Sequence, residues 1–191
     1  MQRRCAFAAL VLSLLSSPAR AQNPRPDTGV EDIAIVRSLR VERIAPTAFC
    51  AASRTVFPQP ATVEDRYDLK AVATDAASGK ITDADGARVG TFHACYGPTA
   101  ESRVFSYYAE GEVGEVLLVG RGQCRVTKRD FPEAGLILLN CRLDLTALTA
   151  GYVGGQLTTN TLASRSTLGA KTDPPGYAQA SIVTIRLWKR R

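Results

Sequence analysis

The sequence predicts an all-β protein, an antiparallel barrel of about eight strands, with a two-sheet β-sandwich as the alternative. Apolar residues recur at every second position in short segments separated by Gly, Pro and Asp, a pattern typical of strands joined by turns. No segment has the three- to four-residue apolar spacing of an amphipathic helix, which disfavours parallel strands with helical crossovers. Because a closed barrel leaves no unpaired edge strand, we favour it over the sandwich.

The clearest element is a hairpin over residues 115–145. Two arms rich in Val, Leu and Ile flank residues 130–135, where Pro132 and Gly135 supply the backbone angles of a turn. Cys124 and Cys141 lie equally far from the centre of that turn and would face each other in a regular hairpin. We therefore prefer a disulfide between them, although four cysteines in the exported chain allow three pairings.

The other strands follow the same period less cleanly. The first has an irregular pattern and could also form a short helical turn, whereas the last is the cleanest after the hairpin. The strand that ends at Tyr96 is apolar on both faces, which indicates that both faces are covered. Besides the two hairpin arms, we expect strands over 38–44, 67–74, 87–96, 103–109, 156–164 and 178–188.

Proline and glycine mark the connections. Three prolines make residues 45–61 a loop, and a Cys50–Cys95 disulfide would tie that loop to the barrel. Residues 146–155 form a Gly-rich connection, and residues 168–176 form another loop. We interpret Asp83-Ala84-Asp85-Gly86 as a hairpin turn rather than half of a calcium loop, because the later oxygen donors are missing.

The N-terminus has the features of a secretory signal peptide. Arg3 and Arg4 precede an apolar run over residues 5–15, which is too short to span a membrane, and Ala19-Arg20-Ala21 resembles a cleavage site. We expect residues 1–21 to be removed and the protein to reach the periplasm or the extracellular space. Paired cysteines are typical of such compartments.

The expected organisation after cleavage is one domain. Residues 22–37 are predicted to be a flexible arm, residues 38–188 the barrel, and residues 189–191 a basic tail. The leader contains three of the 24 basic residues, so the exported chain has 21 basic and 18 acidic side chains. This small excess, together with export, argues against a nucleic-acid partner, and no later segment is long and apolar enough for a transmembrane helix.

The chain resembles a group of small secreted barrels. The signal peptide, the run of about eight strands and the Gly-rich segments VGTFHACYG (89–97) and GRGQC (120–124) are similar to the calycin-like barrels of lipocalins and to the barrels of allene oxide cyclases and dirigent proteins. The resemblance covers roughly residues 38–188 and implies a barrel fold. The only tryptophan is Trp188, so the lipocalin Gly-x-Trp near the first strand is absent, and no site residue transfers.

The only histidine, His93, is the candidate catalytic residue, although a structural role is the simpler interpretation. A lone histidine excludes a His-pair zinc site, and bridged cysteines would leave no thiolate for a metal, so we expect neither metal nor cofactor. The candidate ligand-binding residues are Tyr107, Tyr152, Thr159 and Asn160, drawn from an aromatic strand and from a Gly- and Thr-rich segment that could line a barrel mouth.

Three functions are consistent with these patterns. The first is a non-catalytic, disulfide-stabilised exported barrel that binds a small apolar ligand or an envelope component. The second is an enzyme, such as a cyclase, isomerase or hydrolase, that uses His93 with a carboxylate such as Asp144 or Glu115 in the barrel lumen. The third is a protein-interaction domain that uses an exposed strand edge.

Overall fold

The computed structural model describes residues 31–51, 61–168, 170 and 179–189. The predicted signal peptide, residues 22–30 of the predicted arm and residues 190–191 lie outside this part of the chain. The described elements are β1 (Glu31–Ile44), α1 (Ala48–Ala51), β2 (Val63–Thr74), β3 (Ile81–Tyr96), β4 (Val104–Val113), β5 (Val116–Arg129), β6 (Leu136–Ala147), β7 (Tyr152–Ser164), η2 (Arg165–Thr167) and β8 (Gln179–Lys189). No helix in this part is both long and apolar enough to cross a membrane.

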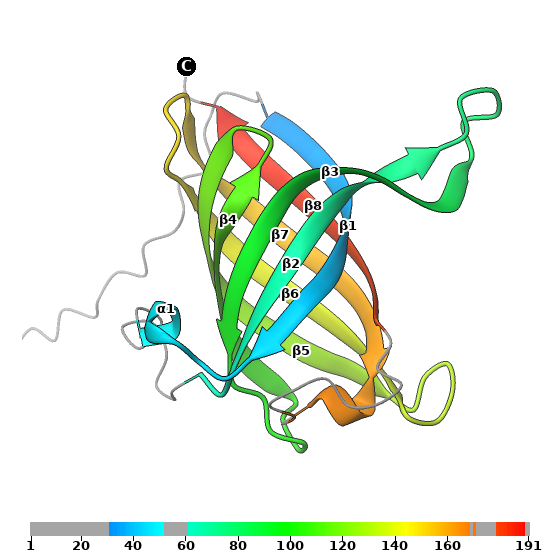
Figure 1. Cartoon of the computed structure of the whole chain (residues 1–191), viewed down its shortest axis with the longest axis vertical. Helices are drawn as coiled ribbons and strands as arrows, with labels where there is room; N and C mark the ends of the chain where they lie inside the picture. Colours follow the sequence, from blue (N-terminus) through cyan, green and yellow to red (C-terminus); the bar gives the residue numbers. More distant parts are fainter. Residues whose placement is uncertain (1–30, 52–60, 169, 171–178, 190–191) are drawn as a thin grey trace, which may run out of the picture.

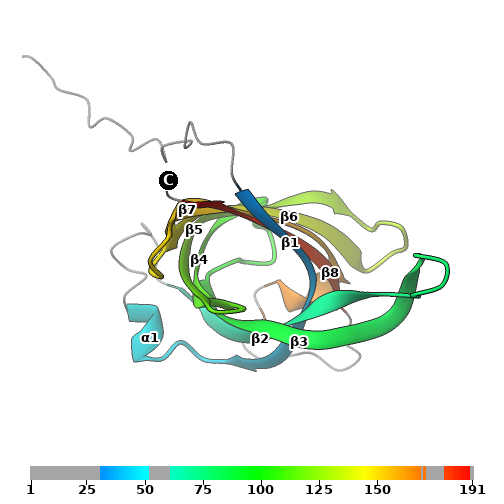
Figure 2. The same ribbon diagram turned by 90° about the horizontal axis from the view of Figure 1, so that it is seen from above.

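The eight strands form one closed antiparallel barrel, as predicted (Figures 1 and 2). Each strand pairs with the next along the chain, and β8 pairs with β1 from Glu31↔Trp188 to Arg37↔Ile182. Up-and-down pairing needs only short turns, and most of the connections are short, whereas residues 45–62 and 165–178 form longer ones. The sandwich alternative is therefore excluded for the described residues.

The first strand begins earlier than predicted. Residues 31–37, expected to belong to a flexible arm, form the first half of β1 and close the barrel against β8. Val36 is buried in the lumen, whereas Ile33 and Ile35 are exposed on the outer wall. These outward isoleucines obscured the alternation of apolar and polar residues on which the prediction depended.

The turn between β2 and β3 also lies elsewhere than predicted. Asp83-Ala84-Asp85-Gly86 is part of β3, and the turn is formed by Asp75 and Ser78, whose backbone N–H donates to Asp75 Oδ1 at 2.7 Å. A Cβ at Gly86 would lie 2.4 Å from the carbonyl oxygen of Ala71, so glycine permits an irregular strand pairing here. The end of the β2–β3 hairpin projects beyond the barrel (Figures 1 and 2).

The Gly-rich connection is shorter than expected, because β7 begins at Tyr152 rather than at residue 156. Gly154 and Gly155 belong to this strand, and the pairing with β8 shifts between Tyr152 and Gly154. The glycines therefore mark an irregularity within a strand, and the sequence pattern alone does not distinguish this from a loop.

Two apolar clusters fill most of the lumen. One includes Leu69, Leu118 and Ile185 and continues to the end of β8. The other includes Ile137 and Leu168 and lies at the end of the barrel where η2 packs. Burial of each such side chain contributes about 1.5–3 kcal/mol. Between the clusters the inward side chains are polar, and the candidate site lies in this layer.

Glycine allows close approach of β5 and β6 at one position. A Cβ at Gly122 would lie 2.0 Å from the carbonyl oxygen of Arg142, whereas a Cβ at Gly120 would meet only side-chain atoms, the nearest being those of Leu145 at 3.1 Å and Leu143 at 3.3 Å. We expect Gly122→Ala to lower the free energy of unfolding by about 2–3 kcal/mol, because the backbone must shift. Gly120→Ala should cost less than about 1 kcal/mol. Urea unfolding followed by circular dichroism measures both, and equal losses would contradict this account.

Candidate functional site

A cluster of buried polar side chains lies in the lumen. We call Arg40, Arg43, Asp65, Tyr67 and Tyr96 the lumen cluster. Asp65 is fully buried, and its two oxygens accept hydrogen bonds from Arg43 Nε and Nη2, both at 2.8 Å. Its Oδ2 also accepts from Arg40 Nη1 at 3.1 Å, from the Tyr67 hydroxyl at 2.9 Å and from the Tyr96 hydroxyl. One carboxylate therefore accepts hydrogen bonds from five donor atoms.

A bulge in β1 brings both arginines into the lumen. Residues 40 and 43 of a regular strand would face opposite sides of the wall, because side chains alternate. The pairing of β1 with β2 shifts between Arg40 and Glu42, so that Arg43 pairs with Asp65 while Arg40 pairs with Tyr67. Both guanidinium side chains are only 2% exposed. A single extra residue thus creates the cluster.

Arg43 also connects the cluster to the end of the barrel. Its Nη1 donates to the carbonyl oxygen of Thr167 at 2.9 Å and to the Thr167 hydroxyl at 2.8 Å. Thr167 is the last residue of η2, and Leu168 after it is buried in the adjoining apolar cluster. The lumen cluster therefore anchors the segment that packs across this end of the barrel.

Ion pairs and burial set the charge states of the lumen cluster. Burial opposes ionisation of Asp65, but the hydrogen bond and charge of Arg43 and the charge of Arg40 outweigh it and lower the pKa of the carboxyl. Burial raises the pKa values of Tyr67 and Tyr96 well above their usual range, so both phenols are neutral. Among the described residues Asp65 is the only buried carboxylate that faces the lumen. Arg40 and Arg43 both pair with this carboxylate.

A small cavity lies beside the lumen cluster, and Tyr67 belongs to both. Its volume is about 60 Å³. One part of its wall is apolar and includes Phe92, Leu143 and Leu157, whereas another part presents hydroxyl groups. Among these, the hydroxyls of Thr161 and Ser181 bond each other at 2.8 Å across β7 and β8. The remaining lining residues are Ser38, Tyr107, Ala109, Cys141, Thr159, Gln179 and Val183. The cavity is amphipathic.

Two of the four candidate ligand-binding residues line this cavity, namely Tyr107 and Thr159. The other two do not. Asn160 follows Thr159 in β7 and therefore faces the outer wall, where it accepts a hydrogen bond from Asn140. Tyr152 lies at the far end of β7, and its hydroxyl donates to Asp32 Oδ2 at 2.7 Å. The candidate ligand-binding set is thus split between the lumen, the outer wall and the barrel mouth.

His93 is not in the lumen. It lies on the outer wall, and its Nε2 is 2.5 Å from Oε1 of Glu64, which is fully buried under the chain that leads into α1. Its ring stacks on Phe49 of α1 with 3.7 Å between centroids. Asp144 and Glu115 are exposed. The combination of His93 with either carboxylate inside the barrel is therefore wrong.

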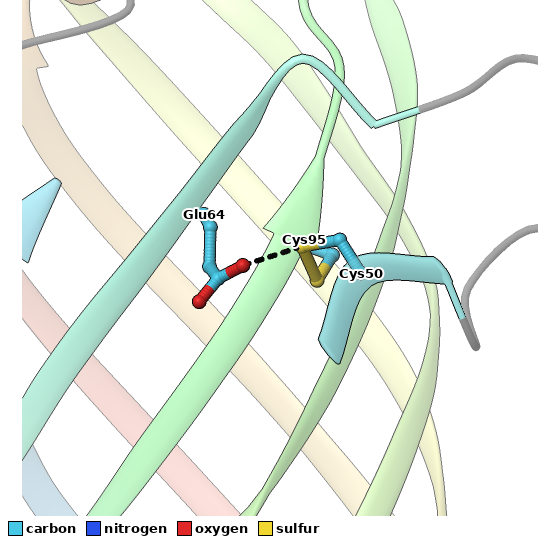
Figure 3. A group of neighbouring side chains, drawn as sticks. All are labelled: Cys50, Glu64 and Cys95. Atoms are coloured by element: carbon cyan, nitrogen blue, oxygen red, sulfur yellow. Dashed lines mark hydrogen bonds between the residues drawn. A yellow bond between two sulfur atoms is a disulfide. The ribbon is translucent and has the colours of Figure 1, made fainter. Parts of the chain in front are cut away.

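Both preferred disulfides are present in the structure. Cys124 and Cys141 pair directly across β5 and β6, and Cys50 of α1 is bonded to Cys95 of β3. Glu64 lies against the second bridge, with Oε2 3.3 Å from the Cys50 sulfur (Figure 3). The ligand atoms of Cys50, Glu64 and Cys95 lie within 4.8 Å of one another, but the two sulfurs are bonded to each other and supply no thiolate for a metal.

Sequence reasoning missed the lumen cluster. One signal was available, because Asp65 occupies the same alternate positions as Val63, Tyr67 and Leu69 in β2. A carboxylate in the apolar phase of a strand indicates a buried, paired charge. Arg43 gave no such signal, since the bulge in β1 changes its phase.

Comparisons with protein-family models, with curated proteins and with solved structures found no match for this chain.

Proposed function

We propose that this protein is an exported barrel that binds a small amphiphilic anion in its lumen. The predicted signal peptide supports export, and the two disulfides are typical of proteins that fold in an oxidising compartment. The similarity to small secreted barrels, several of which enclose ligands, supports a binding role. This ligand is more polar than the small apolar ligand that the sequence predicted.

The observation that carries the proposal is the cavity between the apolar cluster and the lumen cluster, which contains two arginines. A buried ion pair is weak evidence for stability, because well-packed apolar side chains of similar volume often stabilise as much or more. Guanidinium groups present several N–H donors in a fixed geometry that suits carboxylates. A ligand with a negative head group would complement these donors, while Ser38, Thr161 and Ser181 could hydrogen-bond to it.

The cavity volume restricts the ligand. About 60 Å³ exceeds the ~15 Å³ that one water molecule requires and is well below the ~300 Å³ of sites that enclose drug-sized ligands. The apolar wall formed by Phe92, Leu143 and Leu157 offers space for a short hydrocarbon. A short-chain carboxylate fits the cavity volume and is an acceptor for the hydrogen-bond donors beside it.

The structure gives less support to the two alternatives, a lumen enzyme and a protein-interaction domain. Asp65 already accepts hydrogen bonds from five donors and has a lowered pKa, so it is a poor proton acceptor for a lumen enzyme. The closed pairing of β1 with β8 removes the edge strand that a protein partner would extend.

Titration with propionate, 1-propanol and propylamine tests the proposal. We expect propionate to raise the melting temperature and to shift NMR resonances of Thr161 and Leu157, and the isosteric alcohol and amine to do neither. Thr161→Val should weaken propionate binding about tenfold, since it removes a hydroxyl from the site. Thr158→Val is the matched control, because Thr158 lies three residues before Thr161 in β7 but faces the outer wall. Equal binding of 1-propanol, or equal affinity in both variants, would refute a lumen anion site.

A further inference from the structure

The outer wall of the barrel carries a second, larger hollow, which we call the outer groove. It runs across β2 to β5 beside α1 and has a volume of about 720 Å³, within the ~300–1,000 Å³ range of ligand sites. Arg66, His93 and Glu110 lie side by side across its floor, because they pair in register on β2, β3 and β4. Its chemistry differs from that of the lumen.

The position of His93 is held from two sides. Its Nε2 contacts Glu64, which also accepts hydrogen bonds from the backbone N–H of Thr47 at 2.8 Å and from the Thr47 hydroxyl at 2.7 Å. Phe49 covers one face of the imidazole ring. The Cys50–Cys95 disulfide fastens the α1 segment that carries these contacts to β3 (Figure 3). The imidazole is therefore preorganised, with 27% of the side chain exposed.

These contacts determine what His93 presents to a ligand. Burial opposes ionisation of Glu64, but the hydrogen bonds from Thr47 and His93 outweigh it and lower the pKa of the carboxyl. An ionised carboxylate can only accept, so Nε2 of a neutral imidazole carries the proton and Nδ1 offers a lone pair. Within the described residues, Nδ1 has no hydrogen-bond partner. A neutral His93 ring would therefore present an acceptor to the groove.

The carboxylates of the groove are unequally neutralised. Asp68 is paired with Arg88 at 3.5 Å, and Arg66 is paired with Glu42 at 3.1 Å. Glu110 accepts a hydrogen bond from the Tyr108 hydroxyl, whose pKa is raised to about 12 by burial and by this bond. Neither Glu110 nor Glu112, which share one face of β4, forms a salt bridge with any described residue. Within the described part of the chain, these two carboxylates therefore have no cationic partner.

One edge of the groove is apolar. Leu117 and Leu148 are 51% and 62% exposed, and they lie together because the Leu148 N–H donates to the Leu117 carbonyl oxygen at 2.8 Å. Phe49 and Val41 also line the groove. An apolar surface next to carboxylates is typical of a site for an amphiphile rather than of a solvated face.

We propose that the outer groove binds a primary ammonium ion that carries an apolar group. The ammonium has three N–H donors and no acceptor, which matches the imidazole nitrogen and the carboxylates of Glu110 and Glu112. The apolar group covers Leu117, Leu148 and Phe49. This site is separate from the lumen, on the opposite side of the barrel wall, and selects the opposite charge.

The test uses 2-phenylethylamine as the probe, with 3-phenylpropionate and 2-phenylethanol as its anionic and neutral counterparts. Calorimetry should detect binding of the amine to the full exported protein and none of the other two. Amide resonances of Phe49, His93 and Leu117 should shift, whereas those of Thr161 and Ser181 in the lumen should not. The Glu110→Gln, Glu112→Gln double variant should bind at least about tenfold more weakly, because both charge-assisted hydrogen bonds are lost.

Two further variants test the specificity of the site. Glu101→Gln, an exposed residue outside the groove, is the matched control and should bind the amine as wild type does. His93→Phe retains an aromatic ring against Phe49 but removes the acceptor, and should weaken binding severalfold. Equal affinity for 2-phenylethanol, unchanged affinity in the double glutamine variant, or resonance shifts confined to the lumen would each overturn the proposal.

Discussion

Replacement of Asp65 by alanine is expected to lower the free energy of unfolding by about 3–5 kcal/mol, because it leaves two buried guanidiniums without their carboxylate. Asp68→Ala is the matched control. Asp68 lies three residues along β2 on the outer wall, and its partner Arg88 is 63% exposed, so its loss should cost less than about 1 kcal/mol. Urea unfolding of both variants measures the difference. Similar values for the two would show that the lumen cluster does not hold the barrel together.

The same carboxylate should make stability depend on pH. The folded-state pKa of Asp65 lies below the unfolded value of about 3.9, so its contribution is complete above that value and is lost as pH falls through the folded pKa. Unfolding free energies between about pH 2 and pH 7 should therefore fall at the acidic end. Asp65→Asn, which cannot ionise, should show a weaker fall. An identical pH profile in the variant would assign acid sensitivity to other groups.

Loss of the Cys50–Cys95 disulfide should lower the free energy of unfolding by an amount similar to that expected for Asp65→Ala. The bridge closes a loop with a sequence separation of 45 residues, for which loop entropy predicts a stabilisation of about 4 kcal/mol. Release of α1 would also remove Phe49 from His93 and expose Glu64. We expect Cys50→Ala/Cys95→Ala to lose this stability and to become susceptible to proteolysis near α1.

The second disulfide provides the comparison. Cys124 and Cys141 are 17 residues apart, and Cys124→Ala/Cys141→Ala should lose about 3 kcal/mol without a new cleavage site near α1. Urea unfolding and limited proteolysis of both variants measure these effects. A loss below about 1 kcal/mol for Cys50→Ala/Cys95→Ala, or cleavage near α1 in both variants, would contradict the role given to the α1 bridge.

Much of the fold was predictable from local patterns. The central hairpin, its Pro- and Gly-containing turn and the opposed cysteines follow from residues close together in the chain, and the structure has all three. The pairing of β1 with β8 was predicted only indirectly, because a closed barrel leaves no edge strand unpaired. The start of β1 was missed because the outward Ile33 and Ile35 made its period ambiguous.

Less of the candidate site was predictable. Tyr107 and Thr159 were named from composition and do meet at the cavity, while their partners Tyr152 and Asn160 do not. His93 was singled out as the lone histidine, but the apolar residues on both faces of its strand gave no sign that it faces outward. Glu64, its partner, carries no sequence signal, because the loop that buries it comes from another part of the chain.

The sequence by itself determined that alternating strands wrap around a common interior and that sulfur bridges stabilise them, since alternation and turn chemistry are properties of neighbouring residues. Only the tertiary structure decided which side of the wall each polar residue occupies. A one-residue bulge reverses that side for every residue after it, and closure of the barrel then brings together Arg43, Asp65 and Thr167, which lie on separate segments.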